Sequence, residues 1–147
     1  MILLTINDIP VPWTPSRVTR FRHAYNPKYK EKEYAQWQIK SQWSKEPISA
    51  PTTLVFTFHM PIPSGTSKKK LEKMLKGEVR HDKRPDTTNL IKFAEDCLNG
   101  IVLVDDSQVY KIIAEKIYSL APRTVIQVFP IDLNDGPNDL VNHEKEI

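Results

Sequence analysis

The chain has 147 residues, of which 39% are hydrophobic and 27% charged, and its formal net charge is +3. That length suits one domain with a substantial core, and the absence of any apolar run of about 18 residues argues against a membrane-spanning helix. Cys97 is the single cysteine. An internal disulfide and a thiolate metal site are therefore excluded, and we interpret Cys97 as a core residue of a cytoplasmic protein.

The positive charge is not spread evenly along the chain. The last segment, 132–147, holds five acids and one lysine, a net −4 that leaves +7 on residues 1–131. A net charge of +7 on residues 1–131 suits a polyphosphate partner. A modest positive charge is also common in proteins for which it means only solubility. We expect a single folded domain over 1–131 and an acidic, flexible tail over 132–147.

The beginning of the chain predicts a strand followed by irregular, basic chain. The apolar run at 2–6 predicts the strand, and the three prolines between 10 and 15 predict an extended loop over 8–16. Segment 17–32 interleaves basic and aromatic residues, among them Arg17, Arg20, Phe21, Arg22, Tyr25 and Tyr29. Arginine binds phosphate and aromatic rings stack on unpaired bases, so the segment is either a DNA-binding surface or a solvated loop with aromatic anchors.

Two regular elements follow the basic segment. Ala35, Ile39 and Trp43 repeat at four-residue spacing and predict a helix over about 30–45. The residues from 52 to 60 are rich in β-branched and aromatic side chains and predict a strand.

A lysine-rich helix is predicted next. Thr66 or Ser67 is suited to cap its start, and Gly77 is suited to close it. Its lysines include Lys68, Lys69 and Lys70. They form either an arm that faces DNA or an ordinary solvated surface.

The last third of the domain predicts one helix and two strands. Asp86 is a suitable N-cap for a helix from about Thr87 to Leu98, whose buried stripe holds Leu90, Ala94, Cys97 and Leu98. Segments 109–118 and 123–131 predict two antiparallel strands at the end of the domain. This order of elements indicates an α+β (mixed α/β) fold, with a small mixed sheet of about four strands covered by two or three helices.

Carboxylates gather between residues 84 and 109. Four aspartates and one lysine fall within twenty-one residues, namely Asp86, Lys92, Asp96, Asp105 and Asp106. Close carboxylates in a basic protein suggest a cation between them, and magnesium takes one or two carboxylates while it keeps waters or phosphate oxygens. We expect Asp86 and Asp106 to hold one Mg²⁺. The pattern indicates metal-assisted phosphodiester hydrolysis, in which Lys92 orients the attacking water or offsets charge in the transition state.

Each of these residues also has a purely structural explanation. Asp86 could serve only as a helix cap, and Asp105-Asp106 could be only a turn. Lys92 and Asp96 could be only an ion pair on a helix surface. Spacing alone leaves both interpretations open.

At these residues the sequence resembles the RusA-type Holliday junction resolvases, the crossover-junction endodeoxyribonucleases of bacteria and their phages. The resemblance rests on Pro85-Asp86, Asn89, Lys92, Asp96, Leu98-Asn99-Gly100 and Asp105-Asp106-Ser107-Gln108-Val109. The segment from Pro12 to Ser16 also resembles the family, and the basic insertion that ends MLKGEVRH resembles its longer, phage-type members. The likeness is specific over 84–109 and looser over the rest of 2–130.

The resemblance implies a homodimer that nicks four-way DNA junctions in pairs, with Mg²⁺ or Mn²⁺ as cofactor and three aspartates and a lysine at the site. Two aspartates correspond to Asp86 and Asp106, and the lysine corresponds to Lys92. The position of the third aspartate is Thr88, whose hydroxyl is a neutral and weaker ligand. The missing carboxylate could come from Asp96 or Asp105, with Asp82 as a more distant candidate. The basic residues expected to bind DNA are Arg17, Arg20, Arg22, Lys68, Lys69, Lys70 and Arg84.

Three functions follow from this interpretation. The leading one is metal-dependent resolution of four-way junctions in DNA recombination and repair. Because Thr88 removes a charge from the site, a protein that binds junctions without cutting them is the chief alternative. A nuclease that acts on flaps or replication forks is the third.

Overall fold

The structure, a computed structural model, describes residues 1–131, so the predicted acidic tail lies outside the described residues. In chain order its elements are β1 (Ile2–Ile6), β2 (Arg17–Val18), β3 (Ala24–Tyr25), α1 (Tyr29–Gln42), β4 (Thr52–Pro61), α2 (Lys68–Leu75), α3 (Thr87–Leu98), the short 3-10 helix η1 (Asp106–Gln108), β5 (Val109–Ser119) and β6 (Arg123–Pro130). The predicted α+β class is confirmed. No helix within residues 1–131 is long and apolar enough to cross a membrane.

A four-stranded mixed sheet with the order β1-β6-β4-β5 forms the centre of the molecule. Strand β6 pairs antiparallel with both β1 and β4, and β4 pairs in parallel with the edge strand β5. The last two strands were predicted as an antiparallel pair. They are instead separated by β4, because the chain crosses from one side of β4 to the other between β5 and β6.

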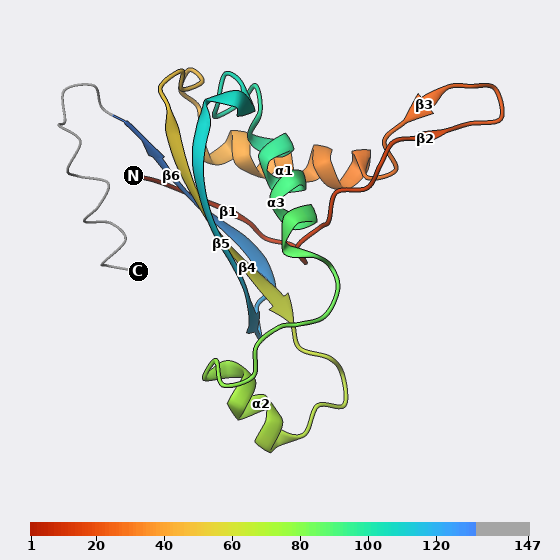
Figure 1. Cartoon of the computed structure of the whole chain (residues 1–147), viewed down its shortest axis with the longest axis vertical. Coiled ribbons are helices and arrows are strands. Elements are labelled where there is room, and N and C mark those ends of the chain that lie inside the picture. Colours follow the sequence, from red (N-terminus) through yellow and green to blue (C-terminus); the bar gives the residue numbers. More distant parts are fainter. Residues whose placement is uncertain (132–147) are drawn as a thin grey trace.

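The core lies between the sheet and the helices α1 and α3, which cover one of its faces (Figure 1). Alternate residues of β4, Leu54, Phe56 and Phe58, point to this side and are almost completely buried. Helix α3 packs the predicted stripe against them, including Cys97. Burial raises the pKa of the Cys97 thiol to about 12, so this residue is a core side chain, as predicted.

Two basic extensions project from this body (Figure 1). The segment expected to be irregular after the proline loop contains a short hairpin, in which β2 pairs antiparallel with β3. Helix α2 lies beyond the end of β4, and the Ser67 hydroxyl accepts a hydrogen bond from the Lys70 N–H at 3.3 Å, as its predicted cap. Gly77 follows this helix with a φ of +78°, which only glycine adopts readily.

Candidate active site along helix α3

Asp86 precedes α3 and is its N-cap residue by backbone position. Its main-chain carbonyl accepts the first helical hydrogen bonds, from Asn89 and Leu90 at 3.1 Å. Its carboxylate, however, makes no capping hydrogen bond to α3, all of which lies in the described part of the chain, and the residue is exposed. An N-cap aspartate normally satisfies a helical N–H with its side chain. Here the carboxylate is left available to a ligand.

A lysine from β5 fixes the loop that carries Asp86. The Lys116 ammonium donates hydrogen bonds to the carbonyl oxygens of Lys83 and Pro85, at 2.8 and 2.9 Å. The register of β5 against β4 turns Lys116 toward the same face of the sheet as Phe58, which is the face that α3 covers. Strand β5 therefore sets the position of Asp86 through the backbone that precedes it.

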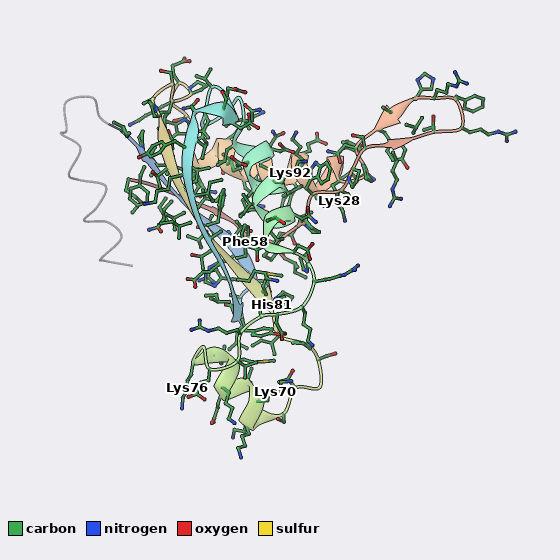
Figure 2. The ribbon with its side chains drawn as sticks, viewed as in Figure 1. Lys28, Phe58, Lys70, Lys76, His81 and Lys92 are labelled. Carbon is green, nitrogen blue, oxygen red and sulfur yellow. The ribbon has the colours of Figure 1, made fainter. Side chains whose placement is uncertain are left out.

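A cleft of about 790 Å³ opens beside Asp86. Its walls come from the N-terminal proline loop, the end of β4, the loop before α3, and Tyr118 of β5. Figure 2 shows His81, one of its lining residues, at the end of the sheet that is nearer to α2. The lining residues are Ile9, Pro10, Pro12, Trp13, Met60, Pro61, Ile62, Pro63, His81, Lys83, Arg84, Pro85, Asp86, Asn89 and Tyr118.

Lys92 lies on the exposed side of α3, in the second turn after Asp86 (Figure 2). Its ammonium lies over the Trp13 ring, 3.5 Å from the ring centroid. The main-chain N–H of Trp13 donates a 2.8 Å hydrogen bond to the Asn89 carbonyl, which ties the proline loop to the first turn of α3. A cation–π contact of this kind restricts where the ammonium lies while leaving it charged.

The two neighbouring aspartates before β5 have different environments. Asp105 caps η1, and its carboxylate accepts hydrogen bonds from the N–H and the hydroxyl of Ser107. These bonds lower the pKa of Asp105. The Gln108 side chain completes the capping box and donates to the carbonyls of Ile48 and Ala50, which fixes η1 against the loop before β4. Asp105 thus has a structural role, whereas Asp106 follows it with an exposed side chain.

Asp106 is near enough to Glu95, in the later turns of α3, for its charge to act on that residue. Burial raises the pKa of Glu95, and the charges of Asp106 and Asp96 raise it further. Glu95 was not among the residues predicted for the site. Its spacing in the sequence could have indicated it, because Thr88, Lys92 and Glu95 are spaced i, i+4 and i+7 and therefore share one helix face.

The carboxylates are distributed along α3 rather than gathered at one point. Glu95 lies nine positions after Asp86, roughly 13 Å along a helix axis, so these two cannot share one ion, whereas Asp106 reaches α3 from η1, outside the helix. Thr88, where the family pattern places an aspartate, is exposed in the first turn. Within residues 1–131, no three histidine, cysteine, aspartate or glutamate side chains converge closely enough to hold a metal ion. A bound ion would therefore complete its shell with waters and substrate oxygens.

The basic residues predicted to contact DNA lie in three places. Arg17, Arg20 and Arg22 belong to the hairpin extension, together with Phe21, which is 81% exposed. Lys68, Lys69 and Lys70 lie on α2, at the other end of the molecule, where Figure 2 labels Lys70. Arg84 lines the cleft next to Asp86. The site on α3 thus lies between two separate basic extensions.

Comparison with known proteins identifies the family. The family model described as Endodeoxyribonuclease RusA matches residues 10–129. The chain therefore belongs to the RusA endodeoxyribonuclease family, which confirms the resemblance drawn from the motifs between 84 and 109. An uncharacterized protein of Bacillus subtilis strain 168, YqaN, is 36% identical over 83 residues, which cover 55% of this chain and 58% of that protein. The match thus spans less than two thirds of that relative.

Proposed function

We propose that the protein is a divalent-metal-dependent endonuclease that cuts four-way DNA junctions. Membership of the RusA endodeoxyribonuclease family supports nuclease chemistry on DNA. The observation that carries the proposal is the Asp86 carboxylate, which is exposed on the rim of a cleft and does not cap the helix that it precedes. A carboxylate held in place by its backbone but left unpaired is suited to bind a cation beside a phosphate.

The donor chemistry of the site fits Mg²⁺, with Mn²⁺ as a substitute. Asp86 and Asp106 offer hard carboxylate oxygens, and a cation near Asp106 would relieve the repulsion that adds to the effect of burial in raising the pKa of Glu95. We infer that Asp86 and Asp106 hold the ion, with Glu95 as a further acid on which the charge of Asp106 acts. When bound, such an ion polarises the scissile phosphate and lowers the pKa of a bound water.

The other residues of the site position the DNA strand and offset charge. Lys92, held over the Trp13 ring, places its ammonium on the exposed face of α3, where it offsets negative charge that develops on the phosphate. Arg84 beside Asp86 offers a contact to a neighbouring phosphate. The hairpin and α2 supply further phosphate contacts on either side.

We further propose that the active form is a homodimer in the cytoplasm. A four-way junction has approximate two-fold symmetry, and two copies of one site related by a two-fold axis would nick opposite strands symmetrically.

The second candidate function is junction binding without cleavage, which Thr88 favours. A neutral hydroxyl replaces an acid in the first turn of α3, so the site holds less negative charge for a cation. In that case the basic extensions would retain the DNA while the scissile phosphate remained intact.

Incubation of the purified protein with a synthetic four-way junction in Mg²⁺ or Mn²⁺ tests the proposal. We expect paired nicks at symmetric positions, with slower cleavage of flaps and forks of the same sequence. Tight binding with no cleavage in either metal would favour the second function. Faster cleavage of flaps or forks would assign the enzyme to those substrates instead.

A further inference from the structure

The cleft beside Asp86 has a largely apolar interior. Trp13 from the proline loop, Met60 and Ile62 from the end of β4 and its continuation, and Tyr118 of β5 line a space of about 790 Å³. That volume lies within the range of roughly 300–1,000 Å³ that is usual for pockets that hold small organic groups. A space of this size and polarity is suited to a flat aromatic group.

Positive charge surrounds the same space. Lys83 and Arg84 line the cleft and are both exposed, and the Lys116 ammonium lies behind the loop that carries them. These cations suit an anionic group attached to whatever fills the apolar interior. A nucleotide combines the two features, since its base is flat and aromatic and its phosphate is negative.

One wall of the cleft carries a histidine ring. The ring of His81 packs against that of Tyr118, with centroids 4.9 Å apart, and its Nδ1 atom is buried with no hydrogen-bond partner among residues 1–131. Burial lowers the pKa of His81, and the charge of Lys116 lowers it further, so the ring is neutral at pH 7. A neutral imidazole offers one donor and one acceptor, and because Nδ1 is buried, the other ring nitrogen, Nε2, is the atom that would meet the polar edge of a base.

We propose that this cleft receives one unpaired nucleobase of the DNA strand whose phosphate lies at Asp86. Trp13 and Tyr118 supply aromatic surface for the base, His81 meets its polar edge, and Lys83 and Arg84 meet its phosphate. This inference rests on the proposed nuclease function and deepens it. A stacked base pair cannot enter the cleft, whereas a base at a branch point leaves its stack more easily. The cleft therefore favours branched DNA over an intact duplex.

Fluorescence of 2-aminopurine tests this directly. The probe is placed singly within three nucleotides of the branch point of a four-way junction, and Ca²⁺ replaces Mg²⁺ so that the DNA stays intact. We expect the wild-type protein to change the fluorescence strongly at one position and little elsewhere. Ile62→Trp, which fills the cleft, should abolish that change. Leu120→Trp, at a residue that is 72% exposed and outside the cleft, should preserve it.

Affinity for junctions with a single abasic site gives a second measurement that needs no variant. Removing the base that enters the cleft should weaken wild-type binding by about tenfold, because base–aromatic stacking contributes on that order. If no position in the window changes either the fluorescence or the affinity by more than twofold, the cleft does not hold a base. If Ile62→Trp keeps the fluorescence change, the base is bound elsewhere.

Cleavage of the same junction in Mg²⁺ separates this inference from the proposed function. A position-specific signal without cleavage supports the base-binding cleft and contradicts the nuclease assignment. Cleavage without any position-specific signal supports the nuclease assignment and overturns the base-binding cleft.

Discussion

The two ends of α3 hold their carboxylates in different ways. At the first end, Asp86 is exposed, and Lys116 fixes the preceding loop through two carbonyl oxygens. In the later turns, Glu95 is partly buried near Asp106 and Asp96, and their repulsion contributes to its raised pKa. The first end is therefore built by backbone contacts. The second consists of charges that a cation would stabilise.

This difference assigns separate roles to the two ends. Contacts within the protein hold the loop before Asp86, so under the proposed function this residue is suited to orient an ion and the phosphate at the rim of the cleft. The charges around Glu95 repel one another, so under the proposed function this end is suited to respond to metal binding. Variants at the two ends should therefore behave differently.

The largest effect is expected from removing either proposed ligand. Asp86→Asn and Asp106→Asn should each slow single-turnover cleavage of a four-way junction by at least about a hundredfold, since the loss of outer-shell partners alone often reduces activity 10–100-fold. Junction binding should persist. Glu33→Gln, at an exposed acid on α1 outside the cleft lining, is the control. A variant that cuts within twofold of the wild type would remove that residue from the metal site.

A smaller effect is expected at the far end of the helix. Glu95→Gln should raise the Mg²⁺ concentration needed for half-maximal cleavage by about tenfold, because it removes an acid on which the charge of Asp106 acts. Asp96→Asn, the neighbouring change of the same kind, should have little effect. A Mg²⁺ titration of both variants measures the two shifts. A larger shift in Asp96→Asn than in Glu95→Gln would show that Asp96, and not Glu95, supports metal binding.

An added acid at the first end should strengthen metal binding. Thr88→Asp should increase cleavage at low Mg²⁺ severalfold and leave it nearly unchanged at saturating Mg²⁺, since a further carboxylate raises affinity for the ion. Thr87→Asp places the same charge in the same helical turn but on another side, and so controls for the helix dipole. Equal gains in both variants would show that charge near the helix start, rather than a ligand, is responsible.

The two basic extensions allow DNA binding to be compared on either side of α3. Neutralising Arg17, Arg20 and Arg22 together should weaken junction binding and reduce the slope of log affinity against log salt. The expected change is roughly 0.9 for each phosphate that the variant no longer neutralises, up to about 2.7. The matched triple variant at Lys68, Lys69 and Lys70 measures the α2 contribution. An unchanged slope in either variant would exclude that extension from the DNA interface.

The smallest expected effects concern how the stability of the protein without metal changes with pH. They have opposite signs for His81, in the loop before α3, and Glu95, in the later turns of α3. The lowered pKa of His81 favours the neutral ring in the folded state, so stability should fall as pH drops below about 6.5. The raised pKa of Glu95 favours the protonated acid, so stability should fall as pH rises above about 4.5. In thermal unfolding, His81→Gln should reduce the loss of stability at low pH, and Glu95→Gln should reduce the loss of stability above about pH 4.5. Identical profiles for both variants would contradict the assigned causes.

Much of the fold could be predicted from local patterns. The strand at 2–6, the buried stripe of α3 and the Ser67 cap all follow from periodicity or capping chemistry, which act over a few residues. The pairing of β6 between β1 and β4 could not be predicted. Strand order depends on contacts between segments distant in sequence, and the two final strands looked like neighbours because they are consecutive.

For the candidate site, the predictions rest on residue types and their spacing. Asp86, Lys92 and Asp106 were identified from their spacing and from the family motif. Glu95 was missed because its significance depends on how close Asp106 approaches α3, which is a tertiary contact. The structural role of Asp105 likewise depends on Ser107 and Gln108 closing a capping box around it.

The most direct test of the account is the position of Mn²⁺ in a crystal soaked with this ion, located by its anomalous scattering. The account predicts one strong peak contacted by carboxylate oxygens of both Asp86 and Asp106, with Lys92 nearby. An ion bound to Asp106 and Glu95 while Asp86 points away from it, or no ion at saturating Mn²⁺, would contradict it.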